Sequence, residues 1–245
     1  MKCALASKCF INGDVQYNKN IIINTMIDYS NKADIVVFGE SFLQGFDSLK
    51  FNSSSDLNIA ISQNDVIIKE IQQISKDYNI AVSFGFIEKS DSKLYSSQIT
   101  IDKNGEIINL FRRVSQGWKE PFASEIYCEG TSFTTFIFMG KKIVIALCGD
   151  LWYEDNVNLI KTLHADVIFW PVYTDYSPNE WNTNAKYEYA EQAGKTKSKV
   201  LYVNSYCKDK TANPLAKGGS ALFIDGLIKH ELPSGKEGVL IVCIE

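Results

Sequence analysis

Residues 142–150, KIVIALCGD, place a reactive thiol directly after a continuous apolar run. The run has the length of a strand, and its unbroken apolar character is typical of a strand that is covered on both faces. Cys148 follows the run, and Gly149 and Asp150 come next. In layered α/β folds, functional side chains gather at the carboxyl ends of such strands. The stretch therefore predicts a buried strand that ends with Cys148 in a crevice.

Two other apolar runs end in side chains that can assist a thiol. Residues 35–38 lead to Glu40, and residues 107–111 lead to an arginine pair that ends at Arg113. A carboxylate can accept the proton of a thiol, and a cation can stabilise a developing oxyanion. Taken singly, each has an ordinary structural interpretation, because a cysteine is usually a small buried hydrophobe and Glu and Arg are usually solvated. The combination predicts a nucleophilic site.

Strand-length runs alternate with helical patterns along the whole chain. Ten runs predict strands, at residues 35–38, 80–86, 97–101, 107–111, 133–138, 142–147, 167–170, 200–204, 220–224 and 239–244. Apolar faces at helical spacing lie within residues 20–29, 67–78, 156–163 and 181–193. Turn residues at 102–105 and 225–226 predict antiparallel hairpins. We therefore expect an α/β fold in a single domain over residues 1–245, a four-layer α-β-β-α sandwich of two mixed sheets with helices outside.

The composition is that of an ordinary globular protein. Of the 245 residues, 45% are apolar and 22% are charged, which excludes disorder and a coiled coil. The longest apolar runs are far shorter than the ~20 residues that a membrane helix needs. Residues 1–10 carry no cleavage signature, so we expect a cytoplasmic protein without a membrane partner. The net charge of −4 and the lack of a basic stripe predict that the chain has no nucleic-acid partner.

Other kinds of catalytic site find little support in the sequence. The six cysteines form no C-x-x-C pair, and none is spaced from a histidine as metal ligands are, so we expect reduced thiols and no metal site. A Cys–His dyad would have to use His164 or His230, the only two histidines. His164 follows a predicted helix, where a helix-dipole cap is its expected role. No G-x-S-x-G or G-x-G-x-x-G motif is present.

Three segments, in this order, resemble those of the nitrilase superfamily of carbon–nitrogen hydrolases. Residues 33–40, ADIVVFGE, are similar to the strand that ends in that family's general-base glutamate. Residues 143–154, IVIALCGDLWYE, are similar to the segment of the nucleophilic cysteine, in which an aspartate follows two residues later. Residues 165–171, ADVIFWP, match the strand after the nucleophile helix. The resemblance covers the chain from end to end and implies the four-layer fold.

The chain departs from the family pattern at the catalytic cation. The family's lysine lies in a Tyr-Arg-Lys turn, whereas this chain has Phe111-Arg112-Arg113 there. Two interpretations are open: Arg113 takes the role of the lysine, or Lys119 reaches the pocket. Lys119 is slightly favoured, because Trp118 can pin it and Glu120 lies where many members of the family carry a second, structural or assisting glutamate. A third interpretation is a catalytically impaired site.

The resemblance also implies a reaction. Glu40 would deprotonate Cys148, and the thiolate would attack an amide-type carbonyl while the cation and the Gly149 N–H hold the oxyanion. Hydrolysis of the thioester would then need no metal or organic cofactor. The implied substrate is a small amide or an N-carbamoyl amine that releases ammonia. Trp152 and Tyr173 are candidate substrate-binding side chains, although core or interface roles suit them equally.

The resemblance further implies a homodimer or a higher homo-oligomer, because members of the family usually pair through the helices beside the nucleophile. The alternative to an enzyme is a binding or regulatory protein of the same fold. Such a protein would keep the pocket without turnover, and its Cys148 need not be reactive.

Overall fold

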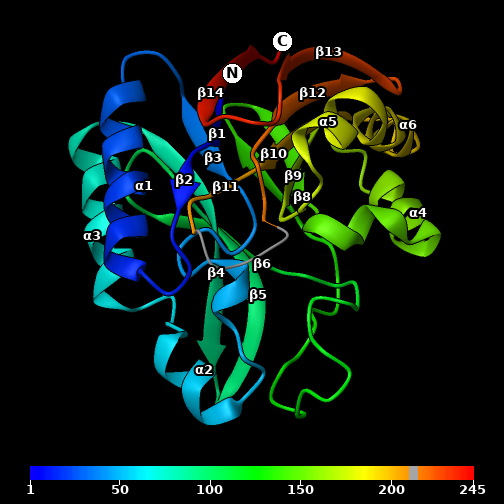
Figure 1. Ribbon diagram of the computed structural model, residues 1–245. Helices are drawn as coiled ribbons and strands as arrows, with labels where there is room; N and C mark the ends of the chain where they lie inside the picture. Colours follow the sequence, from blue (N-terminus) through cyan, green and yellow to red (C-terminus); the bar gives the residue numbers. More distant parts are fainter. Residues whose placement is uncertain (210–214) are drawn as a thin grey trace.

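The computed structural model describes residues 1–209 and 215–245, which contain two six-stranded sheets and one small sheet (Figure 1). The first sheet has the order β14 (Gly238–Cys243), β1 (Lys2–Ser7), β3 (Ile35–Phe38), β4 (Ala81–Ser90), β5 (Lys93–Ile101) and β6 (Ile107–Arg112). The second has the order β13 (Leu227–Leu232), β12 (Ser220–Ile224), β10 (Lys199–Asn204), β9 (Val167–Val172), β8 (Lys141–Ile145) and β7 (Thr135–Phe138). The small sheet pairs β2 (Cys9–Phe10) with β11 (Tyr206–Cys207).

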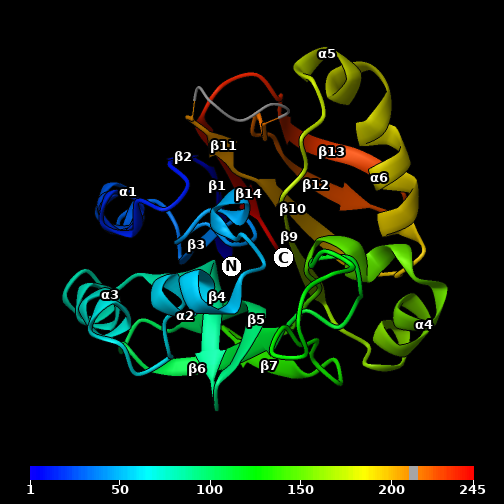
Figure 2. The ribbon, with the colours of Figure 1, turned by 60° about the horizontal axis from the view of Figure 1, so that its bottom comes forward.

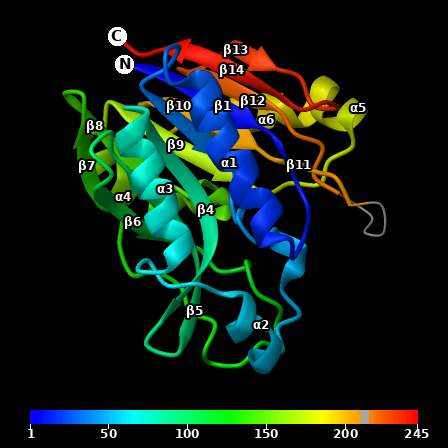
Figure 3. The same ribbon diagram turned by 90° about the vertical axis from the view of Figure 1, so that its left-hand side faces the viewer.

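Helices cover the outer faces of both large sheets. Helices α1 (Val15–Tyr29) and α3 (Val66–Asp77) lie side by side against the first sheet (Figure 3). Helices α4 (Glu154–Thr162) and α6 (Lys186–Gly194) lie on the far side of the second sheet (Figure 2). The shorter helices are α2 (Ser53–Ile59) and α5 (Pro178–Glu180), and one π-helical turn spans Trp181–Ala185. This arrangement confirms the predicted α-β-β-α sandwich of two mixed sheets. None of the described helices is both long enough and apolar enough to span a membrane.

The alternation of side chains along each strand produces the layers. In β3, Ile35 and Val37 belong to the apolar cluster that fills the space between the two sheets. Their neighbours Val36 and Phe38 point to the other face and pack with residues of α3 such as Ile68. Because successive strand side chains face opposite ways, a strand covered on both faces must be apolar throughout. The four residues of β3 are accordingly all buried.

The parallel strands bring the predicted site residues to one end of the sandwich. Strand β3 runs parallel to β1 and β4 in the first sheet, and β9 runs parallel to β8 and β10 in the second. The Glu40 N–H, just beyond β3, donates to the carbonyl of Val172 at the end of β9, with an N···O distance of 3.2 Å. The carboxyl ends of strands from both sheets therefore adjoin. The predicted hairpin turns also form, between β5 and β6 and between β12 and β13.

Candidate active site

Glu40 lies at the carboxyl end of β3 with its side chain fully buried. Its Oε1 accepts hydrogen bonds from Ser96 Oγ at 2.9 Å and from Arg113 Nη1 at 3.0 Å. Its Oε2 is also buried and has no hydrogen-bond partner among the described residues. Buried carboxylate oxygens are nearly always hydrogen-bonded, so an open one calls for an explanation. Oε2 is therefore the oxygen that is available to take a proton.

Cys148 begins a short 3-10 helix, Cys148–Trp152, with a strained backbone. Its φ is +43°, a left-handed conformation that residues other than glycine seldom adopt. The Trp170 indole N–H donates to the Cys148 carbonyl at 2.8 Å and helps to hold this turn. The thiol lies 3.7 Å from the carbonyl oxygen of Tyr173, to which it can donate. Strain of this kind gathers at active sites, where the surrounding structure holds it in place.

The environment keeps the Cys148 thiol protonated. Burial and the negative charge of Glu40 raise the pKa of Cys148 to about 12, against the opposing effect of the Arg113 charge. A thiol with that pKa forms almost no thiolate at neutral pH. It becomes a nucleophile only when a base takes its proton as it attacks. Glu40 is the charged carboxylate whose field reaches the thiol most strongly.

Arg113 supplies the positive charge of the site. Its side chain is 6% exposed, and besides the bond to Glu40 its Nε donates to Ser115 Oγ at 2.9 Å. Burial opposes the charge, but the negative charges of Glu40 and Asp150 prevail and raise the pKa of Arg113 above its usual range. The guanidinium therefore stays protonated at every physiological pH.

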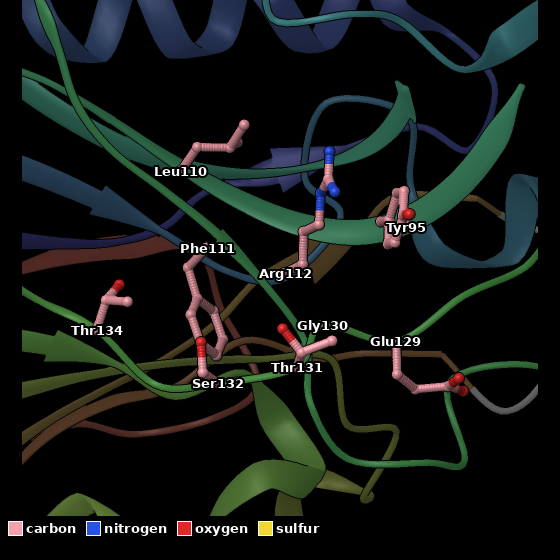
Figure 4. A pocket seen from close by; sticks show the side chains of 9 residues that line it. All are labelled: Tyr95, Leu110, Phe111, Arg112, Glu129, Gly130, Thr131, Ser132 and Thr134. Atoms are coloured by element: carbon pink, nitrogen blue, oxygen red, sulfur yellow. The ribbon is translucent and has the colours of Figure 1, made fainter. Parts of the chain in front are cut away.

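The neighbouring arginine is directed elsewhere. Arg112 binds Glu88 through two hydrogen bonds, of 2.8 and 2.6 Å, and its guanidinium lies 3.9 Å from the centre of the Tyr95 ring. It lines a separate pocket of about 270 Å³ together with Glu129 and residues of the following loop (Figure 4). Successive residues at the end of β6 thus face opposite ways, which places Arg113 in the site and Arg112 outside it.

Lys119 and Glu120 do not join this cluster. Lys119 Nζ donates to the Tyr127 carbonyl at 2.6 Å and to Glu129 at 3.0 Å, and Glu120 is exposed. Trp118, which was expected to pin Lys119 near the pocket, packs in a third apolar cluster with Tyr127. The preference for Lys119 over Arg113 therefore does not match the geometry, because Arg113 is the cation that lies beside Glu40.

Asp150 ties the nucleophile segment to the arginine loop. Its buried carboxylate accepts from the Val114 and Ser115 N–H groups at 3.1 and 2.6 Å, and from the Leu147 N–H at 2.8 Å. Burial raises the pKa of Asp150 to about 6, against these hydrogen bonds. Asp150 is a residue of this cluster for which the sequence predicted no role of its own. The sequence does contain a signal for such a role, since Asp150 is a charged residue two positions after the cysteine in an otherwise apolar segment.

The three candidate substrate-binding residues have different positions. Gly149 lies against the Arg113 guanidinium. Tyr173 offers its backbone carbonyl to the thiol, while its ring stacks on Phe46 with centroids 5.1 Å apart and its hydroxyl donates to Asp47. Trp152 is 43% exposed, and its ring packs with Trp170 and Tyr189. Gly149 and the Tyr173 backbone thus border the thiol, whereas the Trp152 ring extends towards the surface. In the described part of the chain, no group of three or more His, Cys, Asp or Glu side chains is arranged to hold a metal ion.

Known proteins with related sequences include several amidases. An (R)-stereoselective amidase from Pseudomonas sp. is 24% identical over 168 residues, which cover 69% of this chain and 58% of that protein. A glutamine-dependent NAD(+) synthetase from Aquifex aeolicus is 24% identical over 245 residues, which cover 96% of this chain and 39% of that protein. The chain thus spans about two fifths to three fifths of the length of these curated relatives.

Solved structures and a family model agree with this relationship. An amidase of the nitrilase superfamily from Nesterenkonia AN1, solved as a cysteine-to-alanine mutant, superposes with a TM-score of 0.80 at 17% identity. The superposition covers 99% of this chain and 89% of that one, and it shows a common fold. The model of the carbon–nitrogen hydrolase family matches residues 14–244. The chain therefore belongs to the carbon–nitrogen hydrolase family, the nitrilase superfamily.

Proposed function

We propose that this chain hydrolyses the carbon–nitrogen bond of a small amide or N-carbamoyl amine through a thioester on Cys148. The observation that carries the proposal is the buried pair of Glu40 and Arg113 beside the cysteine, with one oxygen of Glu40 held at 3.0 Å by Arg113 and the other without a partner among the described residues. Most buried carboxylate oxygens are hydrogen-bonded, so the open Oε2 beside a nucleophile supports the role of Glu40 as a base. A general base must keep one oxygen free.

The first step forms a bond between sulfur and the carbonyl carbon. Glu40 Oε2 takes the thiol proton as Cys148 Sγ attacks, and the carbonyl π electrons move onto oxygen. Arg113 Nη2, which has no hydrogen-bond partner among the described residues, and the Gly149 N–H are the donors proposed for this oxyanion. One such preorganised donor contributes about 3 kcal/mol to catalysis. The arginine also offsets the repulsion between thiolate and carboxylate.

The second step breaks the carbon–nitrogen bond. Glu40, now protonated, gives its proton to the leaving nitrogen, and ammonia or an amine departs as the oxyanion collapses to the thioester. A water molecule then gives a proton to Glu40 and attacks the thioester carbon, which restores the thiol and releases the acid. The same carboxylate thus acts twice as a base and twice as an acid, and the Arg113 charge stays constant throughout.

The names of the relatives support this substrate class. They include the (R)-stereoselective amidase and N-carbamoylputrescine amidases from Arabidopsis thaliana and Solanum tuberosum. In the Nesterenkonia amidase, a glutamate-to-glutamine mutant shows covalent addition of the acetamide moiety of fluoroacetamide at the active-site cysteine. A cytoplasmic location and a homodimer or higher homo-oligomer stay predictions.

Ammonia release from a panel of amides tests the proposal. The panel contains butyramide, acetamide and an N-carbamoyl alkylamine, assayed with the wild type and with C148A, E40Q and R113A. We expect ammonia from the wild type with at least one compound and from none of the variants above background. If no compound is turned over and butyramide leaves no adduct on Cys148, the non-catalytic binding protein becomes the better account.

A further inference from the structure

Gly149 leaves a space that the Arg113 guanidinium fills. A Cβ atom built on Gly149 would clash with Arg113 Nη2 and would lie 3.0 Å from Ser115 Oγ. Real Cβ atoms essentially never come as close to a neighbour as this one would come to Nη2. The glycine is not demanded by the backbone, because its φ lies outside the left-handed range. The steric demand comes from the arginine.

The arginine cannot easily move away from such a Cβ. Its Nη1 is bound to Glu40 at 3.0 Å and its Nε to Ser115 at 2.9 Å, and the Ser115 N–H is bound in turn to Asp150 at 2.6 Å. Any side chain at position 149 would therefore break one of these bonds or displace Nη2 from its place against residue 149.

A lysine at position 113 would not require the absence of a Cβ atom at position 149. Its side chain is one atom shorter than that of arginine, so in an extended conformation Nζ comes to about the position of the guanidinium carbon. That carbon lies 3.4 Å from the Cβ position of residue 149, an ordinary van der Waals distance. Lysine at 113 thus removes the clash with a Cβ at 149 and leaves the 3.0 Å approach to Ser115 Oγ as the one tight contact, whereas arginine at 113 requires the Cβ to be absent.

We propose that Gly149 is a positioning residue, and that residues 113 and 149 act as a size-compensating pair. Because Gly149 has no side chain, the guanidinium of Arg113 fits at a place where only the shorter side chain of a lysine would fit beside a Cβ atom. Nη2 then lies against Gly149, next to Cys148. The catalytic consequence rests on the proposed function, in which Nη2 binds the substrate oxyanion. The steric coupling between the two positions does not depend on that function.

A double-mutant cycle over R113K, G149A and R113K/G149A tests the pair. Three quantities are measured for each protein: the kcat and KM for butyramide, the rate of iodoacetamide labelling of Cys148 by peptide mass mapping, and the melting temperature. We expect G149A to lower kcat/KM and the labelling rate by about tenfold or more, mainly through kcat, since an oxyanion donor is displaced. Adding R113K to G149A should restore at least about fivefold of that loss and raise the melting temperature.

Matched variants control for general effects of the two changes. G238A adds a methyl group against the flexible tips of Leu232, at 3.0 and 3.2 Å, on strand β14, which β1 separates from β3. R112K makes the same replacement at the adjacent arginine, which binds Glu88 instead of Glu40. Both should leave the labelling rate of Cys148 within about twofold of the wild type, and neither should change the effect of G149A.

The outcomes separate the pair from the proposed function. Additive effects of R113K and G149A on all three quantities would overturn the size-compensating pair. If G149A is insoluble, a double variant that is equally insoluble would overturn it too. In both cases, butyramide turnover by the wild type would still support the proposed function. If the wild type turns over no amide, the proposed function fails. The labelling rate and the melting temperature then still decide whether the two positions are coupled.

Discussion

Glu40 Oε1 and Arg113 Nη1 form a hydrogen bond of 3.0 Å between side chains that are 0% and 6% exposed. Two opposite charges removed from water must stabilise each other, and loss of either one leaves the other uncompensated. The pair therefore has consequences for folding as well as for chemistry. The pair also links the first sheet to the segment that carries Cys148, because the residues after Arg113, Val114 and Ser115, donate hydrogen bonds to Asp150.

Replacement of Arg113 should destabilise the fold. In R113A the Glu40 charge would remain buried with only Ser96 as a donor, and breaking such a pair costs about 3–5 kcal/mol. Urea unfolding of R113A and the wild type measures the loss. K103A is the control, because the Lys103–Asp34 pair is 27% and 23% exposed. Its removal should cost less than about 1 kcal/mol, and an equal loss in both variants would contradict the role of burial.

Cys148 should make the fold less stable at alkaline pH. Its folded pKa of about 12 lies above the value for an unfolded thiol. Between the two values the unfolded chain releases a proton that the folded chain keeps, so the free energy of unfolding falls as the pH rises. The wild type should lose about 1 kcal/mol per pH unit relative to C148A between about pH 9 and 11. Parallel unfolding curves for the two proteins over that range would contradict the raised pKa.

Asp150 should matter for both stability and turnover. D150A leaves the N–H groups of Val114, Ser115 and Leu147 without their acceptor, which should lower the melting temperature and loosen the Arg113 loop. We expect kcat for butyramide to fall by about tenfold or more with a smaller change in KM. D166A is the control. Asp166 accepts a hydrogen bond from the Lys142 N–H at 2.7 Å near the start of β8, whereas Asp150 lies beyond the end of that strand. Equal losses of kcat in the two variants would mean that Asp150 acts only through stability.

Lys119 should be dispensable for the reaction. Its ammonium is bound to Glu129 and the Tyr127 carbonyl, outside the Glu40 cluster. K119A should keep the kcat for butyramide within about twofold of the wild type, and R113A should lose it. A loss of activity in K119A comparable with that in R113A would show that the loop rearranges to bring the lysine into the site.

Much of the fold could be predicted because buried strands carry a plain signal. Residues 35–38 and 167–170 are continuous apolar runs, and both are fully buried strands. Strand β1 was missed, although its residues Cys3 to Ser7 are all buried, because its sequence KCALAS is rich in small residues without strong strand preference. Strand β13 was missed for the opposite reason, since most of its residues are exposed and charged or polar side chains interrupt it.

The site could be predicted only in part. Glu40 and Cys148 each follow an apolar run that the pattern of the sequence indicates to be a buried strand, and the carboxyl ends of such strands meet in layered folds. The choice between Arg113 and Lys119 depended on which way a loop turns after β6, where the sequence shows no strand pattern and Trp118 packs beside Tyr127. Ser96 and Asp150 bind their partners over long separations in the chain, so local sequence carries little sign of their contacts.

The central claim is that Cys148 carries the acyl group, and rapid acid quenching tests it most directly. Wild-type protein and the E40Q and C148A variants are mixed with butyramide, quenched within one turnover and mapped by peptide mass spectrometry. The account predicts a butyryl thioester on Cys148 in the wild type, and neither an adduct nor ammonia in the two variants. Ammonia release that persists in C148A, or a butyryl group on another residue, would contradict it.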